Sequence, residues 1–176
     1  MSKFIAKNVI CSFPHVFTAN TKFGPDGKRE ITIMLNKSDH ADLIDSIKAD
    51  IEDMKAKSSK PIADDKICLK DGDDAGSRDE YKGHYTIKAS SSKIVAVVDV
   101  KKDLLDQNTC DMQGGDTVNA SINLWLQDNS YGQRVNAQLN AVQYIKSGGD
   151  NRFGDTSSGV NDFDIEDGVT DDADDF

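Results

Sequence analysis

The segment TVNASINLWLQ, residues 117–127, decides the fold class because apolar and polar side chains alternate along it without a break. Strict alternation predicts a β-strand with one buried side and one side facing solvent. The apolar side consists of Val118, Ala120, Ile122, Leu124 and Leu126. The other side consists of Asn119, Ser121, Asn123, Trp125 and Gln127. We therefore expect a half-buried strand that presents Trp125 among polar residues.

Strand patterns recur on both sides of this segment. The loop DNSYG, residues 128–132, predicts a hairpin turn into a partner strand that runs on through Tyr144 and Ile145. Upstream, residues 3–13 and 30–35 read as two strands joined by a turn containing Pro25-Asp26-Gly27. Shorter strands are expected at residues 67–70, 83–90 and 93–99.

One stretch has helical rather than strand periodicity. Its apolar residues recur at helical spacing, at Leu43, Ile44, Ile47, Ile51 and Met54. We expect an amphipathic helix over residues 39–57, with Ser38 or Asp39 as its N-cap. A mainly β chain with one such helix predicts a small antiparallel barrel of five to seven strands.

The charge is divided unevenly along the chain. The net charge is −10, which by itself argues against nucleic-acid binding. Residues 150–176 hold ten acidic residues and one basic residue, Arg152, so this segment carries −9 and residues 1–149 carry −1. We therefore predict one domain over residues 1–149 and a disordered acidic tail over 150–176, which has too few apolar residues to fold alone.

Several classes of protein find no support in the sequence. The cysteines Cys11, Cys68 and Cys110 fit neither a disulfide framework nor a zinc motif. Neither acidic stretch fits a calcium loop: the one starting at Asp71 has Gly76 at position six but Ala75 at position five and Lys82 at position twelve, and the one starting at Asp162 has neither the glycine nor the glutamate. No catalytic motif is present, so we expect no enzymatic activity, no metal and no cofactor. Neither a membrane span nor a secretory signal is evident, and we expect a cytoplasmic protein.

Aromatic and basic residues are interleaved in the predicted β domain. Binding of a single nucleic-acid strand needs cations for the phosphates and flat side chains on which bases stack. The stacking candidates are Phe23, Tyr81, Tyr85, Trp125 and Tyr131. The phosphate-contacting candidates are Lys22, Lys28, Arg29, Lys82, Lys88 and Arg134. The alternatives are that Trp125 packs under the helix or a loop, and that Phe23 tucks into the end of the barrel.

The end of the acidic tail combines dense negative charge with an aromatic ring. Asp171, Asp172, Asp174 and Asp175 precede Phe176. Such a segment suits a small pocket with a basic rim on a partner protein. The alternative is a generic solubilising tail.

Several blocks together resemble phage-encoded single-stranded DNA-binding proteins. The resemblance lies in residues 20–35, 69–73, 80–85, 97–99 and 118–148, and the Phe-terminated acidic tail is similar to those of bacterial and phage single-strand binders. The resemblance implies an OB-like barrel that binds single-stranded DNA without sequence preference in replication, recombination or repair. It also implies a tail that recruits replication or recombination proteins and competes with DNA, and in a phage protein the location would be the host cytoplasm.

The sequence leaves both the function and the oligomeric state open to an alternative. The competing hypothesis is an acidic DNA mimic, or another protein-interaction module, that does not bind DNA. A homodimer is compatible with the sequence, which does not fix the oligomeric state.

Overall fold

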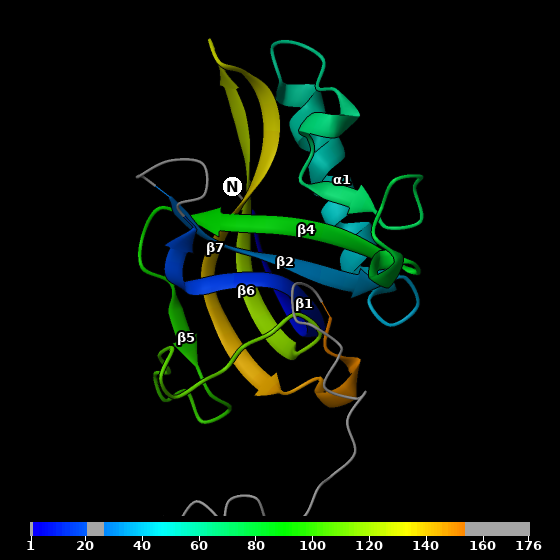
Figure 1. Cartoon of the computed structure of the whole chain (residues 1–176). Coiled ribbons are helices and arrows are strands. Elements are labelled where there is room, and N and C mark those ends of the chain that lie inside the picture. Colours follow the sequence, from blue (N-terminus) through cyan, green and yellow to red (C-terminus); the bar gives the residue numbers. More distant parts are fainter. Residues whose placement is uncertain (1, 21–26, 154–176) are drawn as a thin grey trace, which may run out of the picture.

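The computed structural model describes residues 2–20 and 27–153, and these form seven strands, one α-helix and three short 3₁₀ helices (Figure 1). The strands are β1 (Ser2–Asn20), β2 (Lys28–Asn36), β3 (Leu69–Asp71), β4 (His84–Ser91), β5 (Ala96–Val98), β6 (Thr117–Asn129) and β7 (Gly132–Lys146). The helices are α1 (Ala41–Lys57), η1 (Asp64–Lys66), η2 (Asp79–Tyr81) and η3 (Gly149–Asn151). The mainly β prediction with one amphipathic helix is confirmed.

Five strands close into a barrel. Hydrogen-bonded neighbours follow the order β4, β2, β1, β6 and β7, and β7 pairs back with β4 at Ala89 and Ala137. β3 adds to the free edge of β4, and β5 adds to β7. This order and closure are those of an OB-like barrel, as expected. The closing pair and the β5–β7 pair run parallel, whereas the expectation was of antiparallel strands throughout.

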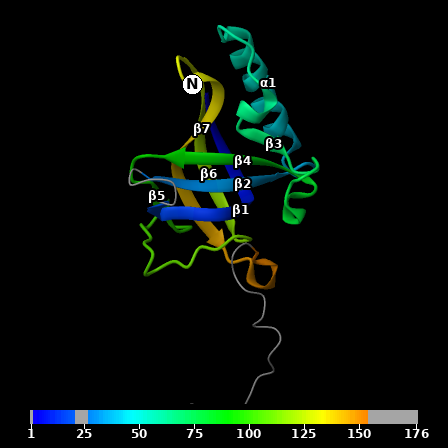
Figure 2. The same ribbon diagram turned by 45° about the horizontal axis from the view of Figure 1, so that its top comes forward.

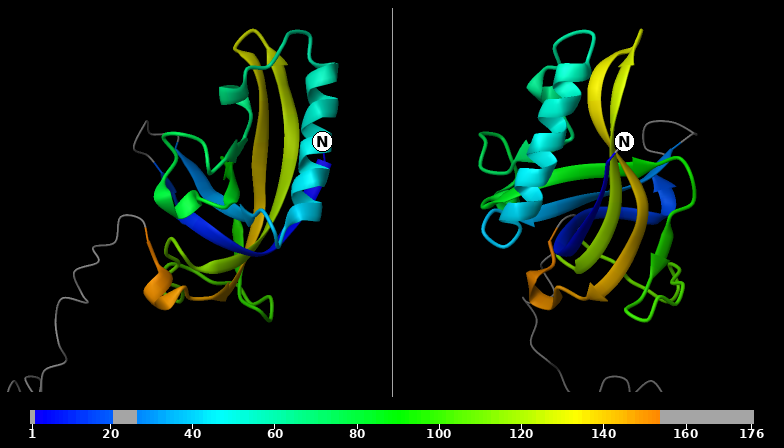
Figure 3. Two further views of the ribbon diagram at one scale, coloured as in Figure 1. Left: turned by 90° about the vertical axis from the view of Figure 1, so that its right-hand side faces the viewer. Right: turned by 180° about the vertical axis from the view of Figure 1, so that it is seen from behind.

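The core follows the alternation in the sequence. The apolar side of β6 is buried, with Ile122 and Leu124 fully inaccessible, and β2 contributes Ile31, Ile33 and Leu35. α1 packs its buried apolar residues on the same core and lies beside the β6–β7 hairpin (Figures 2 and 3). Asp128 at the end of β6 accepts hydrogen bonds from the Ser59 backbone N–H and hydroxyl at 2.8 and 2.6 Å, which ties the hairpin to the segment after α1.

The start of α1 differs from the prediction. The helix begins after His40, and neither Ser38 nor Asp39 caps it with a side chain. Instead the Asn36 side-chain oxygen accepts hydrogen bonds from the N–H groups of Ser38 and Asp39 at 2.9 and 3.0 Å. The N-cap prediction is wrong because this turn, built on the Asn36 side chain, takes the chain into the helix.

The last described residues pack against the end of the barrel away from the β6–β7 hairpin tip (Figures 1 and 3). Arg152 bonds to the fully buried Asp116, and the Phe153 N–H donates to the Gly114 carbonyl at 2.8 Å. Gly115 has φ +102, and a Cβ there would lie 2.6 Å from the Arg152 Cα, so this close approach requires glycine. The packed chain thus continues through Phe153, while the division at residue 149 stays a prediction.

Candidate nucleic-acid interface

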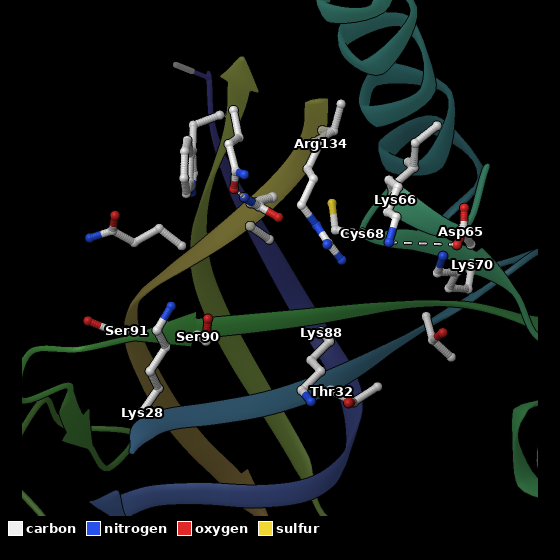
Figure 4. A pocket seen from close by; sticks show the side chains of 18 of the residues that line it. Lys28, Thr32, Asp65, Lys66, Cys68, Lys70, Lys88, Ser90, Ser91 and Arg134 are labelled. Carbon is white, nitrogen blue, oxygen red and sulfur yellow. Dashed lines mark hydrogen bonds and ion pairs between the residues drawn. The ribbon is translucent and has the colours of Figure 1, made fainter. Parts of the chain in front are cut away.

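A wide groove of about 930 Å³ runs across one side of the barrel (Figure 4). Its floor is formed by β2 and β4, and its walls by the β6–β7 hairpin and the segment from Asp65 to Lys70. These segments lie far apart in the sequence, so the groove exists only because the barrel closes. In OB-folds the face of the second and third barrel strands, here β2 and β4, and the loop between the last two carry the oligonucleotide site.

Basic side chains converge on this groove from several elements. They are Lys28, Lys66, Lys70, Lys88, Lys93 and Arg134. Figure 4 shows Arg134 directed into the groove from the hairpin, Lys88 beneath it, and Lys66 and Lys70 on the wall formed by residues 65–70. Among the described lining residues Asp65 is the only acid. The groove is therefore strongly positive although residues 1–149 carry a net charge of −1.

Few of these cations are neutralised within the barrel. Lys88 lies 3.4 Å from Glu30, and Lys66 lies 3.9 Å from Asp65. Lys28, Lys93 and Arg134 form no ion pair with any residue in the described part of the chain. Positive charge left without an internal partner is available to an external polyanion.

Strand alternation explains why Lys88 faces the groove. Thr86, Lys88 and Ser90 share one side of β4, and Thr32 of β2 lies opposite Lys88 in the register. The intervening Ile87 and Ala89 point into the core. Lysine and hydroxyl side chains therefore form a polar floor on which a phosphate backbone can lie.

Three aromatic side chains line the same groove. Trp125 lies on β6 opposite Asn136 and is half-buried, on the polar side of the strand where the sequence placed it. Tyr131, in the hairpin turn, is 91% exposed. The Tyr81 hydroxyl forms a hydrogen bond with the Ser12 hydroxyl, with 2.9 Å between the two oxygens. This bond fixes the Tyr81 ring at another point of the groove lining. Flat surfaces thus accompany the cations, as single-strand binding requires.

Other predicted residues lie elsewhere. Tyr85 shares the core-facing side of β4, and its hydroxyl accepts a hydrogen bond from the ammonium of Lys48 at 2.6 Å. Arg29 lies at an odd position of β2, on the same side of the strand as the residues that face the core. Lys82 is exposed and does not line the groove. Tyr85, Arg29 and Lys82 are therefore not brought together with the groove cations. Lys22, Phe23 and the tail residues Asp171, Asp172, Asp174, Asp175 and Phe176 lie outside the described residues.

The sequence interpretation missed three groove cations, namely Lys66, Lys70 and Lys93. None of them lies beside an aromatic residue in the sequence, and they belong to η1, β3 and the turn after β4. Two of them lie in predicted strands, Lys70 in the strand at residues 67–70 and Lys93 at the start of the strand at residues 93–99. The position of Lys70 next to the groove depends on the bridge from Ile67 to Val135 in β7.

One cysteine, Cys68, also lines the groove. Burial raises the pKa of the Cys68 thiol to about 11, which keeps it protonated and unreactive at neutral pH. No set of three His, Cys, Asp or Glu side chains among residues 2–20 and 27–153 is arranged to hold a metal ion. None of the described helices has the length and apolar character needed to span a bilayer.

A closed five-stranded barrel with a cation-lined groove bearing aromatic side chains defines the class of OB-fold single-strand binders. The family described as Enterobacter phage Enc34, ssDNA-binding protein, matches residues 2–176, and the chain belongs to this family. No curated protein matches the chain.

Solved structures agree with this family. The single-stranded DNA-binding protein from bacteriophage Enc34 in complex with ssDNA is 29% identical, with a TM-score of 0.75, over 86% of this chain and 89% of that one. The same phage protein in another structure is 27% identical, with a TM-score of 0.76, over 92% of this chain and 90% of that one. Gp2.5, a single-stranded DNA binding protein encoded by bacteriophage T7, shares the fold at 16% identity and a TM-score of 0.62, over 94% of this chain and 99% of that one.

Proposed function

We propose that this protein binds single-stranded DNA in the groove, without sequence preference and without catalysis, during phage DNA replication, recombination or repair in the host cytoplasm. The observation that carries the proposal is the convergence of six cations and three aromatic rings on one groove. Membership of the Enc34 family supports it, since a family member has been solved in complex with ssDNA.

The groove supplies the two interactions that a single strand needs. Lys28, Lys88 and Arg134, together with the cations at residues 66, 70 and 93, neutralise phosphates. Trp125 and Tyr131 stack on bases, each contact contributing about 1–3 kcal/mol. Stacking accepts every base because each has a flat face, so the binding is independent of sequence.

The acidic tail is the second part of the proposed function. Its charge of −9 is opposite in sign to the groove, so the tail competes with DNA for the same cations. Its terminal Phe176, after a run of aspartates, docks on replication or recombination proteins. The removal of the tail is therefore expected to tighten DNA binding.

The test is an anisotropy titration of labelled oligo-dT with the full chain and with a chain ending after Phe153, at several salt concentrations. We expect salt-sensitive binding by both proteins and tighter binding by the shorter one. The truncation must keep Arg152, because a cut at residue 149 would leave Asp116 buried without its cationic partner. Equal affinities would refute competition by the tail, and absence of binding by both would favour the DNA-mimic alternative.

A further inference from the structure

Exposed apolar side chains gather around β5. Three of the large apolar residues that the described structure leaves exposed fall within eleven positions: Ile94 is 84% exposed, Leu104 78% and Val100 60%. Val95 and Val97 point into the core, so Ile94, Ala96 and Val98 share the outward side of the β5 segment, and the exposed Val100 continues this row into the turn that follows. We call this outward row, with Leu104, the apolar strip.

Leu104 belongs to the strip because the chain folds back on β5. Val98 and Leu104 form an antiparallel bridge, and the Leu105 N–H donates to the Val97 carbonyl at 2.8 Å. The turn between them is held by the Asp99 carboxylate, which accepts the N–H groups of Lys101 and Asp103 at 2.8 and 3.0 Å. The strip is therefore a formed surface rather than scattered apolar residues. Contiguous exposed apolar surface of this kind marks an interaction site.

The charges beside the strip favour an acidic partner. Lys93 precedes Ile94, and Lys101 and Lys102 follow Val100, and all three are exposed. The Asp99 carboxylate is bonded within the turn, and the exposed acids, Asp103 and Asp106, lie on either side of Leu104, so the lysines lie at the Ile94 and Val100 positions of the strip. An occupant that alternates apolar and acidic residues would bury its apolar side chains on the strip and place its carboxylates beside the lysines.

This chain contains such a segment. Residues 162–167 read DFDIED, in which Phe163 and Ile165 alternate with acids. The geometry points to docking of this segment on the apolar strip of the same molecule. The inference concerns a contact within the chain and does not depend on DNA binding.

The described end of the chain lies close enough for this contact. An Arg152 Nη2 donates to the Asp111 carbonyl at 2.9 Å, so the end of the packed chain touches the loop that carries Leu104. Leu104 is seven residues from Asp111, a span of at most about 25 Å, whereas the ten residues from Phe153 to Phe163 reach about 35 Å. Figures 1 and 3 show η3 and the loop after β5 at the same end of the barrel.

The contact would also organise the proposed competition at the groove. Lys93 lines the groove and adjoins Ile94, so the strip begins where the groove ends. A segment held on the strip keeps the following residues 168–176 near the groove cations. This consequence, unlike the contact itself, rests on the proposed function.

The test uses methyl NMR of the full-length protein without DNA. The double substitution Phe163→Ser with Ile165→Ser should shift the methyl signals of Ile94, Val100 and Leu104 and leave that of buried Ile122 unchanged. The matched control, Val160→Ser with Val169→Ser, removes two apolar residues from the same region and should leave the strip signals in place.

Two results would overturn the inference. Strip signals that stay unchanged in the Phe163 and Ile165 variant show that this segment does not touch the strip. Wild-type strip signals that move on dilution show a contact between copies instead. Because no DNA is present, either outcome leaves the proposed DNA-binding function standing, and failure of oligo-dT binding would leave the contact untouched.

Discussion

The groove and the opposite end of the barrel both gather charged side chains, but they use them in opposite ways. At the barrel end the Asp116 carboxylate accepts hydrogen bonds from Arg152 at 2.8 and 3.1 Å and from the Gly148 N–H at 2.7 Å. It also accepts the Gln113 N–H and the Tyr144 hydroxyl. We call this set the Asp116 clamp. Every lone pair is used internally, so the clamp holds the fold together.

In the groove the charges have few partners among the described residues. Arg134, Lys28 and Lys93 lack ion pairs there, and the one lining acid, Asp65, lies at 3.9 Å from Lys66. We infer from this comparison that the saturated charges serve stability, whereas the unsaturated charges serve the proposed DNA binding. The two functions should therefore respond separately to substitution.

The largest expected effect is on stability, from Asp116→Ala. Removing one member of a buried ion pair costs about 3–5 kcal/mol, because the groups around it lose their partner. Urea unfolding should show a loss of this size, while the affinity for oligo-dT below the unfolding transition should be unchanged. The control is Asp111→Ala, whose carboxylate is 77% exposed and 3.6 Å from Arg152 and should contribute about 0–1 kcal/mol. Equal losses in the two variants would contradict the role of the clamp.

The next effect is on binding, from Trp125→Ala. Loss of one stacked base should cost about 1–3 kcal/mol, or a rise of about 5- to 150-fold in Kd. Anisotropy titration with oligo-dT measures it, and Trp125→Phe should retain most of the affinity because a flat ring remains. An unchanged Kd for Trp125→Ala would remove this residue from the binding surface.

A smaller effect is expected on salt dependence. Each phosphate contact contributes about 0.7 to the slope of log K against log salt for a single strand. Lys88→Gln should lower the slope by about that amount, whereas Lys82→Gln, outside the groove lining, should leave it unchanged. If Lys82→Gln changed the slope more than Lys88→Gln, the groove would be assigned to the wrong face.

The smallest effect concerns acid. Burial alone would raise the pKa of Asp116, but hydrogen bonds from Arg152, Gly148 and Gln113 outweigh it and hold the pKa below the usual value. Because the pKa of Asp116 is lower in the folded state than in the unfolded state, its ionised carboxylate stabilises the protein at pH values above the unfolded-state pKa of about 3.9. This stabilisation is lost as the pH falls below that value. The Tm of the wild type should therefore fall more steeply below about pH 4 than that of Asp116→Asn. Parallel curves would contradict this.

The strands of the barrel were predictable because the sequence encodes them locally. Alternation over residues 117–127 placed Trp125 on the polar side of β6, and the structure puts it in the groove lining. The same rule, applied to β4, would have separated Tyr85 from Lys88, since odd and even positions face opposite sides. Aromatic and basic residues were grouped because they lie near one another along the chain. This grouping did not consider which side of the strand each residue faces.

Long-range contacts could not be predicted from the sequence. Arg152 was counted with the acidic tail, yet it is bonded to Asp116, 36 positions earlier in the chain. Lys66 and Lys93 reach the groove only because β4 and β7 close the barrel. Such placements depend on the register of pairing, which a single sequence does not display.

The most direct test of the groove is the intrinsic fluorescence of Trp125, the only tryptophan in the chain, during titration with oligo-dT. We predict saturable quenching that follows binding measured by anisotropy of a labelled strand and is reversed by added salt. Binding seen by anisotropy without any change in Trp125 fluorescence would contradict the assignment of the groove as the DNA site.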